Sequence, residues 1–166
     1  MRQKQVGFSL IELLIVVAII LIIAAIAIPS YLRSRLLANE ASTAESLRAI
    51  NTAEVTYSTT YGTGFAPLAN LGGANPCVTS AATACILDSL LSSGTKSGYT
   101  ITTPTPGAIG TVATPNPNFS VSAVPIALGQ TGQRSFCSDQ TGVIRTDPTG
   151  AAPPNPCDSG AFAAIQ

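Results

Sequence analysis

The chain contains no histidine in any of its 166 positions. Without histidine, the Ser-His and Cys-His pairs that activate nucleophiles cannot form, and a mixed Cys/His zinc site is excluded as well. The sequence also lacks a P-loop, a GxGxxG string and an HExxH string. We therefore expect no catalytic residues, no metal site and no cofactor.

Charged residues are scarce, at 10% of the chain, and eight Lys and Arg residues balance eight Asp and Glu residues. There is no basic patch with interleaved aromatic residues, which is the pattern typical of nucleic-acid-binding proteins. We therefore expect no direct binding of nucleic acid by a single copy of the chain.

Residues 8–28 form an almost wholly apolar run in which Glu12 is the single charged residue. As a helix, a run of this length extends about 32 Å, which is enough to cross the hydrocarbon core of a membrane. Arg2 and Lys4 precede the run and favour a cytoplasmic N-terminus, although two arginines beyond the run weaken this argument. A charge inside a bilayer costs about 3 kcal/mol and usually faces a partner rather than lipid.

The run contains no cation that could pair with Glu12. Cleavage after Gly7 would supply one, because Phe8 would then carry a free α-amine one helical turn before Glu12. Such an amine is mostly protonated at neutral pH. It could belong to the same chain or to a neighbouring copy whose helix packs alongside. In the second case the ion pair would set the register between copies, which is a known use of buried charge.

The string from Gly7 to Glu12, GFSLIE, follows a short basic leader and opens the apolar run. This arrangement resembles the class III signal of type IV prepilins and pseudopilins, and the resemblance covers about residues 1–57. It implies that a prepilin peptidase cleaves between Gly7 and Phe8 and N-methylates Phe8. It also implies that Glu12 neutralises the Phe8 amine of an adjacent subunit during filament assembly.

Two positions later in the run bear on the resemblance. Pro29 matches the proline that bends the helix in this family, and its missing N–H is sufficient to kink a helix. Leu21 stands where many members carry a glycine that loosens the helix. An ordinary secretory signal, cut after the Ala-Ile-Ala string that ends at Ala27, and a plain membrane anchor are the alternatives. Neither alternative explains a Gly-Phe pair placed just ahead of Glu12.

The helix is expected to continue beyond Pro29 as an amphipathic helix that ends before Gly62 and Gly64. Its apolar stripe consists of Leu32, Leu36, Leu47, Ile50, Tyr57 and Tyr61, and Thr43 and Glu54 interrupt it. We expect an α+β fold in which this long N-terminal helix packs on a small antiparallel sheet of three or four strands. The expected parts are a leader (1–7), a transmembrane or filament-core helix (8–28), an amphipathic helix (29–61) and a globular head (62–166).

Two segments of the head, residues 99–102 and 119–124, alternate in polarity as strands do, and residues 134–138 and 143–146 also carry strand signals. Residues 139–142, Asp-Gln-Thr-Gly, predict a hairpin turn between the last two. The proline-rich residues 103–117 and 147–156 predict loops, and residues 85–91 predict a short helix. The order of these segments also resembles the sheet region of pilin heads.

The four cysteines do not have the close spacing of a structural zinc site, and an even number outside the cytoplasm favours disulfides. Of three possible pairings, we favour the sequence-local one, Cys77–Cys85 and Cys137–Cys157. The second pair resembles the disulfide-bounded loop of many pilins, and closing a loop of about 20 residues stabilises a fold by roughly 3 kcal/mol. Free thiols used in redox chemistry are the alternative.

Three aspartates, Asp139, Asp147 and Asp158, could line a calcium site like that of some secretion pseudopilins. Their spacing fits no recognised calcium loop, so we interpret them as turn residues.

The resemblance implies a structural subunit of a type IV pilus filament and no enzymatic activity. The precursor would lie in the bacterial inner membrane with a cytoplasmic N-terminus, and the mature chain in the extracellular pilus. Its partners would be other pilin subunits, the prepilin peptidase, and the inner-membrane assembly platform with its ATPase. Filaments of this family serve adhesion, motility or secretion. The alternatives are a pseudopilin of a type II secretion system and a monomeric membrane-anchored binding domain.

Overall fold

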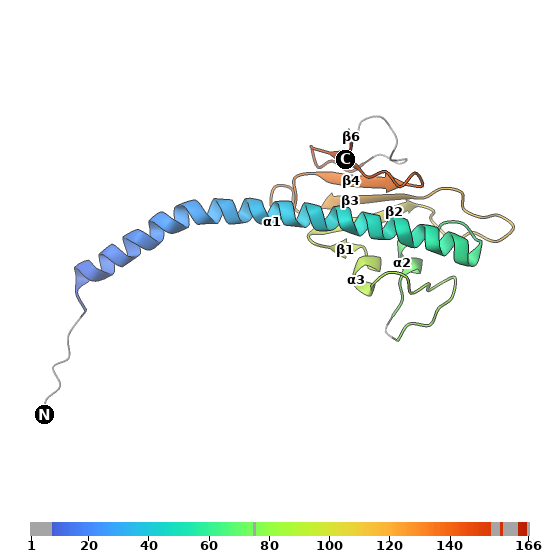
Figure 1. The fold of residues 1–166 in the computed structure, drawn as a ribbon, viewed down its shortest axis with the longest axis horizontal. Helices are drawn as coiled ribbons and strands as arrows, with labels where there is room; N and C mark the ends of the chain where they lie inside the picture. The colour runs from blue at the N-terminus through green and yellow to red at the C-terminus, as the bar shows by residue number, and fades with distance from the viewer. Residues whose placement is uncertain (1–7, 75, 154–156, 158–162, 166) are drawn as a thin grey trace, which may run out of the picture. The chain divides into compact units, whose positions relative to one another are not determined.

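The computed structural model describes residues 8–74, 76–153, 157 and 163–165. Internal contacts divide the chain into two compact units, Met1–Arg35 and Leu36–Gln166. One helix, α1 (Leu10–Tyr61), contributes residues to both units and is the first element in Figure 1.

In the first unit, α1 begins at Leu10, and the N–H of Leu13 donates to the carbonyl of Ser9 at 3.2 Å. The following residues are Leu, Ile, Val and Ala apart from Glu12, so nothing interrupts the helix before Pro29. Pro29 lies inside α1, where its ring leaves one carbonyl of the preceding turn without a backbone donor.

The second unit has an α+β fold, as the sequence predicts. All neighbouring strands of its sheet are antiparallel and follow one another in chain order. Among the described residues the sheet has six strands rather than the three or four expected, because two edge strands of two residues each carry no alternating pattern. The elements after α1 are α2 (Leu68–Leu71), α3 (Ser89–Ser92), β1 (Thr95–Lys96), β2 (Tyr99–Thr105), β3 (Ser120–Pro125), β4 (Ser135–Asp139), β5 (Arg145–Asp147) and β6 (Ala163–Ala164).

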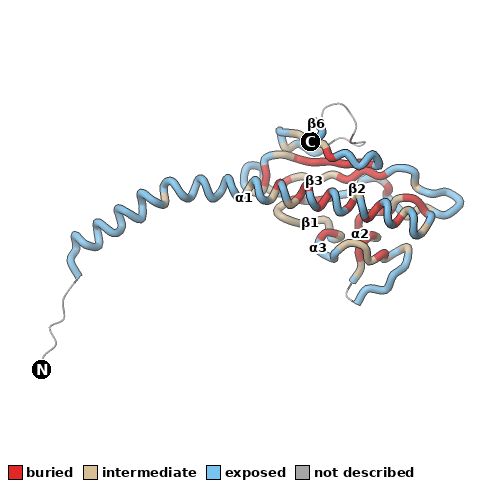
Figure 2. Tube along the Cα trace, viewed as in Figure 1, coloured by how far each residue is buried: buried red, intermediate tan, exposed pale blue. Residues whose placement is uncertain are grey.

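The core lies between the second half of α1 and one face of the sheet (Figure 2). Leu47, Ile50 and Tyr57 of the predicted stripe are buried, which fits the helical period of 3.6 residues. From the sheet, the buried core residues are Tyr99, Ile101, Val121, Ala123 and Phe136.

The buried face of α1 differs from the predicted stripe at its start and at two polar positions. Leu32, in the first unit, is 52% exposed. Thr43 and Glu54, which we expected to interrupt the stripe, are buried within it. Burial of Thr43 leaves no unsatisfied hydroxyl, because this group donates to the carbonyl of Asn39 at 2.8 Å. The helix ends at Tyr61, and Gly62 follows with a φ of 67°, a left-handed conformation that glycine adopts without strain.

Strand β2 extends three residues into the segment that we predicted as a loop, as far as Thr105. Pro104 made that segment read as a loop, because proline cannot donate to a sheet ladder. The pairing of β2 with β3 is irregular between Thr102 and Thr105, and this irregularity accommodates the proline inside the strand.

The short helix predicted over residues 85–91 begins later, as α3. Cys85 has a φ of 58°, so the chain is not helical there. Asp88 then caps α3, because its carboxylate accepts the N–H of Leu91 at 2.8 Å. Helix α2 is a single turn, which is too short for a helical period to be visible in the sequence.

Two disulfides are present, Cys77–Cys85 and Cys137–Cys157, and these are the sequence-local pairs. Cys77 is exposed, whereas Cys137 and Cys157 are buried against each other. Because Cys137 belongs to β4, the second disulfide ties residue 157 to the sheet.

Candidate assembly segment

The apolar segment of the first unit, residues 8–28, is exposed along almost its whole length (Figure 2). Leu10 is 79% exposed and Ile26 is 74% exposed. An apolar surface of this extent on a folded chain marks a site of contact with a membrane or another protein. By length and composition, α1 is the helix of the described residues that could cross a membrane.

Glu12 lies in the first turn of α1, where the partial positive charge of the helix N-terminus favours an acid. The Ser9-Leu10-Ile11-Glu12 string also has the spacing of a capping box. Within residues 8–74, 76–153, 157 and 163–165, the structure shows no hydrogen bond or ion pair of the Glu12 side chain. Phe8 precedes the helix and is 73% exposed, and Gly7 lies outside the described residues.

Glu40 of the second unit has the opposite environment. Its carboxylate is 4% exposed and accepts the backbone N–H groups of Gln133 and Arg134 at 3.0 and 3.1 Å. The guanidinium of Arg134 adds two more donors at 2.9 and 2.6 Å. Burial opposes ionisation of Glu40, but these hydrogen bonds outweigh it and lower the pKa below the ordinary value. Glu40 therefore ties α1 to the segment that precedes β4.

Glu54 is also buried, at 0% exposure, but it has few partners. One carboxylate oxygen accepts the N–H of Ala66 at 3.0 Å, and the other oxygen has no hydrogen-bond partner. Burial raises the pKa of Glu54 to about 7, and the N–H of Ala66 offsets only part of this effect. Glu54 thus holds the segment after α1 with a carboxyl group that is half protonated near neutral pH.

The first residues of the chain match a family model described as the prokaryotic N-terminal methylation motif, over residues 2–28. The chain carries the class III signal of type IV pilins and pseudopilins. No curated protein and no solved structure matches the chain.

This class III signal includes Gly7, Phe8 and Glu12 and ends one residue before Pro29. It implies processing by a prepilin peptidase and assembly into a pilus or a secretion apparatus. The exposed apolar helix fits a precursor that is anchored in a membrane. The long helix packed on an antiparallel sheet is a pilin-like layout, in agreement with the signal.

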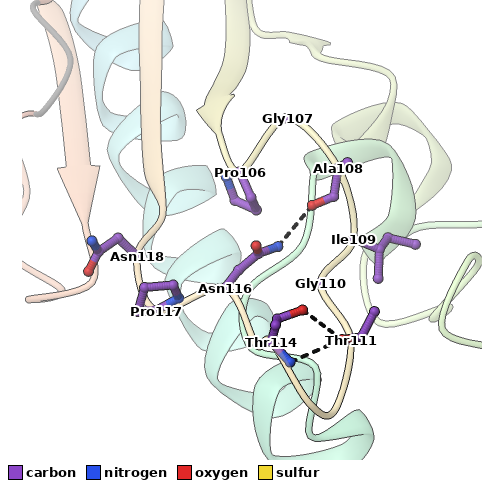
Figure 3. Close-up of a pocket in the computed structure, with 10 residues that line it drawn as sticks. All are labelled: Pro106, Gly107, Ala108, Ile109, Gly110, Thr111, Thr114, Asn116, Pro117 and Asn118. Carbon is purple, nitrogen blue, oxygen red and sulfur yellow. Dashed lines mark hydrogen bonds between the residues drawn. The ribbon is translucent and has the colours of Figure 1, made fainter.

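Beyond the class III signal, a pocket of about 540 Å³ lies in the loop that joins β2 to β3 (Figure 3). The loop closes on itself, because the amide of Asn116 donates to the carbonyls of Phe65 and Ala108 at 2.9 and 2.8 Å. The Thr111 and Thr114 side chains also bond to each other at 2.7 Å. Since these polar groups already have partners within the chain, the pocket is accounted for by loop closure.

Two of the three aspartates considered for calcium, Asp139 and Asp147, cap turns. Asp139 is buried and accepts the N–H and hydroxyl of Thr141, and Asp147 accepts the N–H of Thr149 at 2.8 Å. Asp158 lies outside the described residues. Among the residues that the structure describes, no three His, Cys, Asp or Glu side chains gather in a way that could hold a metal ion.

Sequence reasoning missed Glu40, Arg134 and the role of Glu54. A signal was available, since Glu40 and Glu54 share the face of Leu47 at intervals of seven residues. An acid on the apolar face of a helix needs a donor from another element, and here the donors come from residues near 134 and from Ala66.

Proposed function

We propose that this chain is a structural subunit of a type IV pilus filament. Residues 1–7 are a leader that a prepilin peptidase removes after Gly7, and the new N-terminal Phe8 is N-methylated. Residues 8–28 hold the precursor in the inner membrane with the N-terminus in the cytoplasm and later pack in the filament core. Residues 29–61 continue the helix, with a bend at Pro29, into the head formed by residues 62–166.

One observation carries this proposal: the apolar helix has a single acid, Glu12, for which the described residues offer no partner. A carboxylate at membrane depth needs a cation, and cleavage after Gly7 creates one at Phe8. The amine of an adjacent copy satisfies Glu12 only when the two helices lie side by side in one register. The same pair therefore selects mature subunits and positions them.

The disulfides of the head support a location outside the cytoplasm. Two disulfides hold it, and disulfides persist in oxidising compartments. The assembled filament therefore carries its heads on the outside, where the Cys137–Cys157 loop is stable. Other subunits, the assembly platform and its ATPase supply the remaining parts and the energy, so this chain acts as a building block and not as an enzyme.

Mass spectrometry of the mature chain tests the processing step. We expect an N-terminus at Phe8 that carries one methyl group. A retained leader, or a cut near Ala27, would contradict the proposal, because it would make the segment an anchor or an ordinary secretory signal.

Electron microscopy tests the assembly product. We expect long surface filaments that contain this chain and that disappear when its gene is deleted. If deletion instead stops protein secretion and no surface filaments exist in the wild type, the chain is a pseudopilin of a type II secretion system.

A further inference from the structure

Three residues that follow the apolar helix segment have side chains typical of a membrane boundary. Tyr31 comes three residues after the segment and is 66% exposed. Arg33 and Arg35 come next and are exposed as well. Tyrosine and arginine both combine an apolar part with a polar end, which suits the layer where hydrocarbon meets lipid headgroups. We refer to Tyr31, Arg33 and Arg35 as the boundary residues.

The two arginines have no acidic partner among the residues that the structure describes. Neither has an Asp or Glu within four residues in the sequence, and neither forms an ion pair there. The nearest acid that follows them in the sequence, Glu40, is already bonded to Arg134 at 2.6 Å. Within the described residues, both guanidinium groups are therefore open to a group from outside the chain.

The depth of the boundary residues follows from the length of the apolar segment. As a helix, residues 8–28 extend about 32 Å, which matches a hydrocarbon core of about 30 Å. Measured along the helix, Tyr31 then lies about 5 Å beyond the hydrocarbon, and Arg33 and Arg35 lie about 8 and 11 Å beyond it. The headgroup layer is roughly 5–8 Å thick on each side, and arginine side chains near a helix end can reach back toward it. The boundary residues are thus at headgroup depth whenever residues 8–28 span a membrane.

The arginines are distributed around α1 and do not gather on one face. Helical residues two positions apart point about 160° away from each other, so Arg33 and Arg35 lie on opposite sides of the helix. Tyr31 shares the side of Arg35, one turn earlier. A single docking groove covers one side of a helix, whereas a lipid layer surrounds it. This distribution favours lipid headgroups as the partner.

We propose that the boundary residues bind the headgroups of membrane phospholipids in the leaflet opposite the leader. The arginines recognise the headgroup phosphate, because a planar guanidinium donates two parallel N–H groups to phosphate oxygens. Tyr31 places its ring between the acyl chains and the polar layer. The inference rests on the proposed function, since it takes residues 8–28 as the membrane span.

The contact gives the two ends of the span different roles during maturation. Cleavage after Gly7 removes Arg2 and Lys4, so Arg33 and Arg35 are the first basic residues of the mature chain. Moving a cation through hydrocarbon is costly, so an uncleaved leader opposes withdrawal of the helix toward the opposite side of the membrane. The boundary residues do not cross the hydrocarbon on that path. They therefore set the depth of the mature helix without preventing its exit.

Depth-resolved fluorescence quenching tests the position of the boundary residues. The chain contains no tryptophan, so Tyr31→Trp introduces a single fluorophore. The full-length chain is placed in vesicles of phosphatidylcholine and phosphatidylglycerol whose acyl chains carry bromine at a shallow or a deep position. We expect residue 31 to be quenched severalfold more strongly by the shallow bromine. Leu21→Trp, in the middle of the span, is the control and should show the reverse order.

Removal of the two charges tests the contact with phosphate. Full-length chains isotopically labelled at the arginine guanidinium carbon are studied by solid-state NMR, in which nearby lipid phosphorus dephases the carbon signal. We expect Arg33→Gln/Arg35→Gln to lower the dephased intensity severalfold. Arg48→Gln is the matched control, because Arg48 is an exposed arginine that pairs with Glu45, and it should leave the dephased intensity unchanged.

The outcomes separate this inference from the proposed function. Deep quenching at residue 31, or equal dephased intensity in the wild type and the double variant, overturns the lipid contact and leaves the filament standing. The same holds if the double variant lowers filament yield while the dephased intensity stays unchanged, which would assign the arginines to a neighbouring copy. A tryptophan at position 21 that neither bromine quenches removes the membrane span and overturns both.

Discussion

The two units of this chain treat their acidic residues in opposite ways. In the second unit, Glu40 receives four hydrogen bonds from Gln133 and Arg134, and Glu54 receives one from Ala66. In the first unit, Glu12 receives none from the described residues. Glu40 and Glu54 thus have donors within the chain, whereas Glu12 takes its partner, under the proposed function, from a neighbouring copy. On that proposal, the difference separates residues that fold the subunit from residues that assemble it.

Apolar side chains show the same difference. Leu47, Ile50 and Val121 are fully buried in the second unit, and Leu10, Leu21 and Ile26 are largely exposed in the first. Burial of a leucine or isoleucine side chain contributes about 1.5–3 kcal/mol. The apolar side chains of the first unit therefore contribute this free energy only when a membrane or a neighbouring helix covers them.

Replacement of Glu12 is the most direct test of the proposed difference between the acids of the two units. We expect Glu12→Gln to abolish filament assembly, because an amide attracts the Phe8 amine far less than a carboxylate does. Filament yield should fall by more than about tenfold, in line with a cost above 1.4 kcal/mol per contact. Sheared filaments quantified by immunoblot give the yield.

Glu12→Asp is the matched control, since it keeps the charge and shortens the side chain by one methylene group. It should retain part of the yield. Unfolding of the head should be unchanged in both variants. Wild-type yield with Glu12→Gln would contradict the role proposed for the acid.

Removal of the disulfides should affect the head and not the register of assembly. The Cys137→Ala/Cys157→Ala variant opens a loop of 20 residues and should lower the free energy of unfolding by about 3 kcal/mol. The Cys77→Ala/Cys85→Ala variant opens a loop of 8 residues and should cost slightly less, about 2.5 kcal/mol. Denaturant titration in detergent, followed by circular dichroism, measures both. A larger loss from the shorter loop would contradict the loop-entropy account.

A smaller loss is expected for Glu40→Gln. The amide keeps one acceptor but loses the charge that faces Arg134, so the free energy of unfolding should fall by about 2 kcal/mol. Because the folded-state pKa of Glu40 is lowered, its contribution is present above the unfolded pKa and is lost as the pH falls through the folded one.

Glu45→Gln is the matched control for Glu40→Gln, because Glu45 forms only an exposed pair with Arg48. Its cost should be about 0.3 kcal/mol. Equal losses in the two variants, measured by the same denaturant titration, would show that the hydrogen bonds from Gln133 and Arg134 do not stabilise the fold.

Replacement of Glu54 should have a smaller effect than replacement of Glu40, and one of the opposite sign. The pKa of Glu54 is raised from 4.5 to about 7, so the folded chain holds a proton that the unfolded chain has released. Its stabilising contribution is complete below the unfolded pKa and is lost as the pH rises through the folded one. At about pH 8 we expect Glu54→Gln to raise the free energy of unfolding by about 1–2 kcal/mol.

A pH series of denaturant titrations measures this effect. The wild type should lose stability between about pH 4.5 and 7, and Glu54→Gln should lose less of it over the same interval. Parallel curves for the two chains would contradict a titrating Glu54.

The fold class and the strands in the middle of the sheet followed from the sequence, because β3 alternates, a turn signal follows β4, and the buried residues of α1 recur with a helical period. The strands at the two edges of the sheet could not be predicted from the sequence. A two-residue strand such as β1 has no period, and its position depends on pairing with β2. Pro104 misled the assignment of β2, since tolerance of a proline depends on a local irregularity that only the partner strand reveals.

The candidate site divides in the same way. Gly7, Phe8 and Glu12 could be singled out because their chemistry lies in one short string. Glu40 and Arg134 are separated by 94 residues along the chain, and Glu54 and Ala66 by 12. Such partnerships depend on tertiary packing, which hydrophobic periodicity in one segment does not encode.

The two-residue strands at either edge of the sheet have a consequence for a chain that polymerises. An edge strand offers unpaired backbone groups to any neighbour, and a long flat edge promotes amyloid-like stacking. Strands β1 and β6 have two residues each, so they offer few backbone groups with which a strand of a neighbouring head could pair. In a filament of the proposed kind, edges this short would keep neighbouring heads from pairing strand to strand.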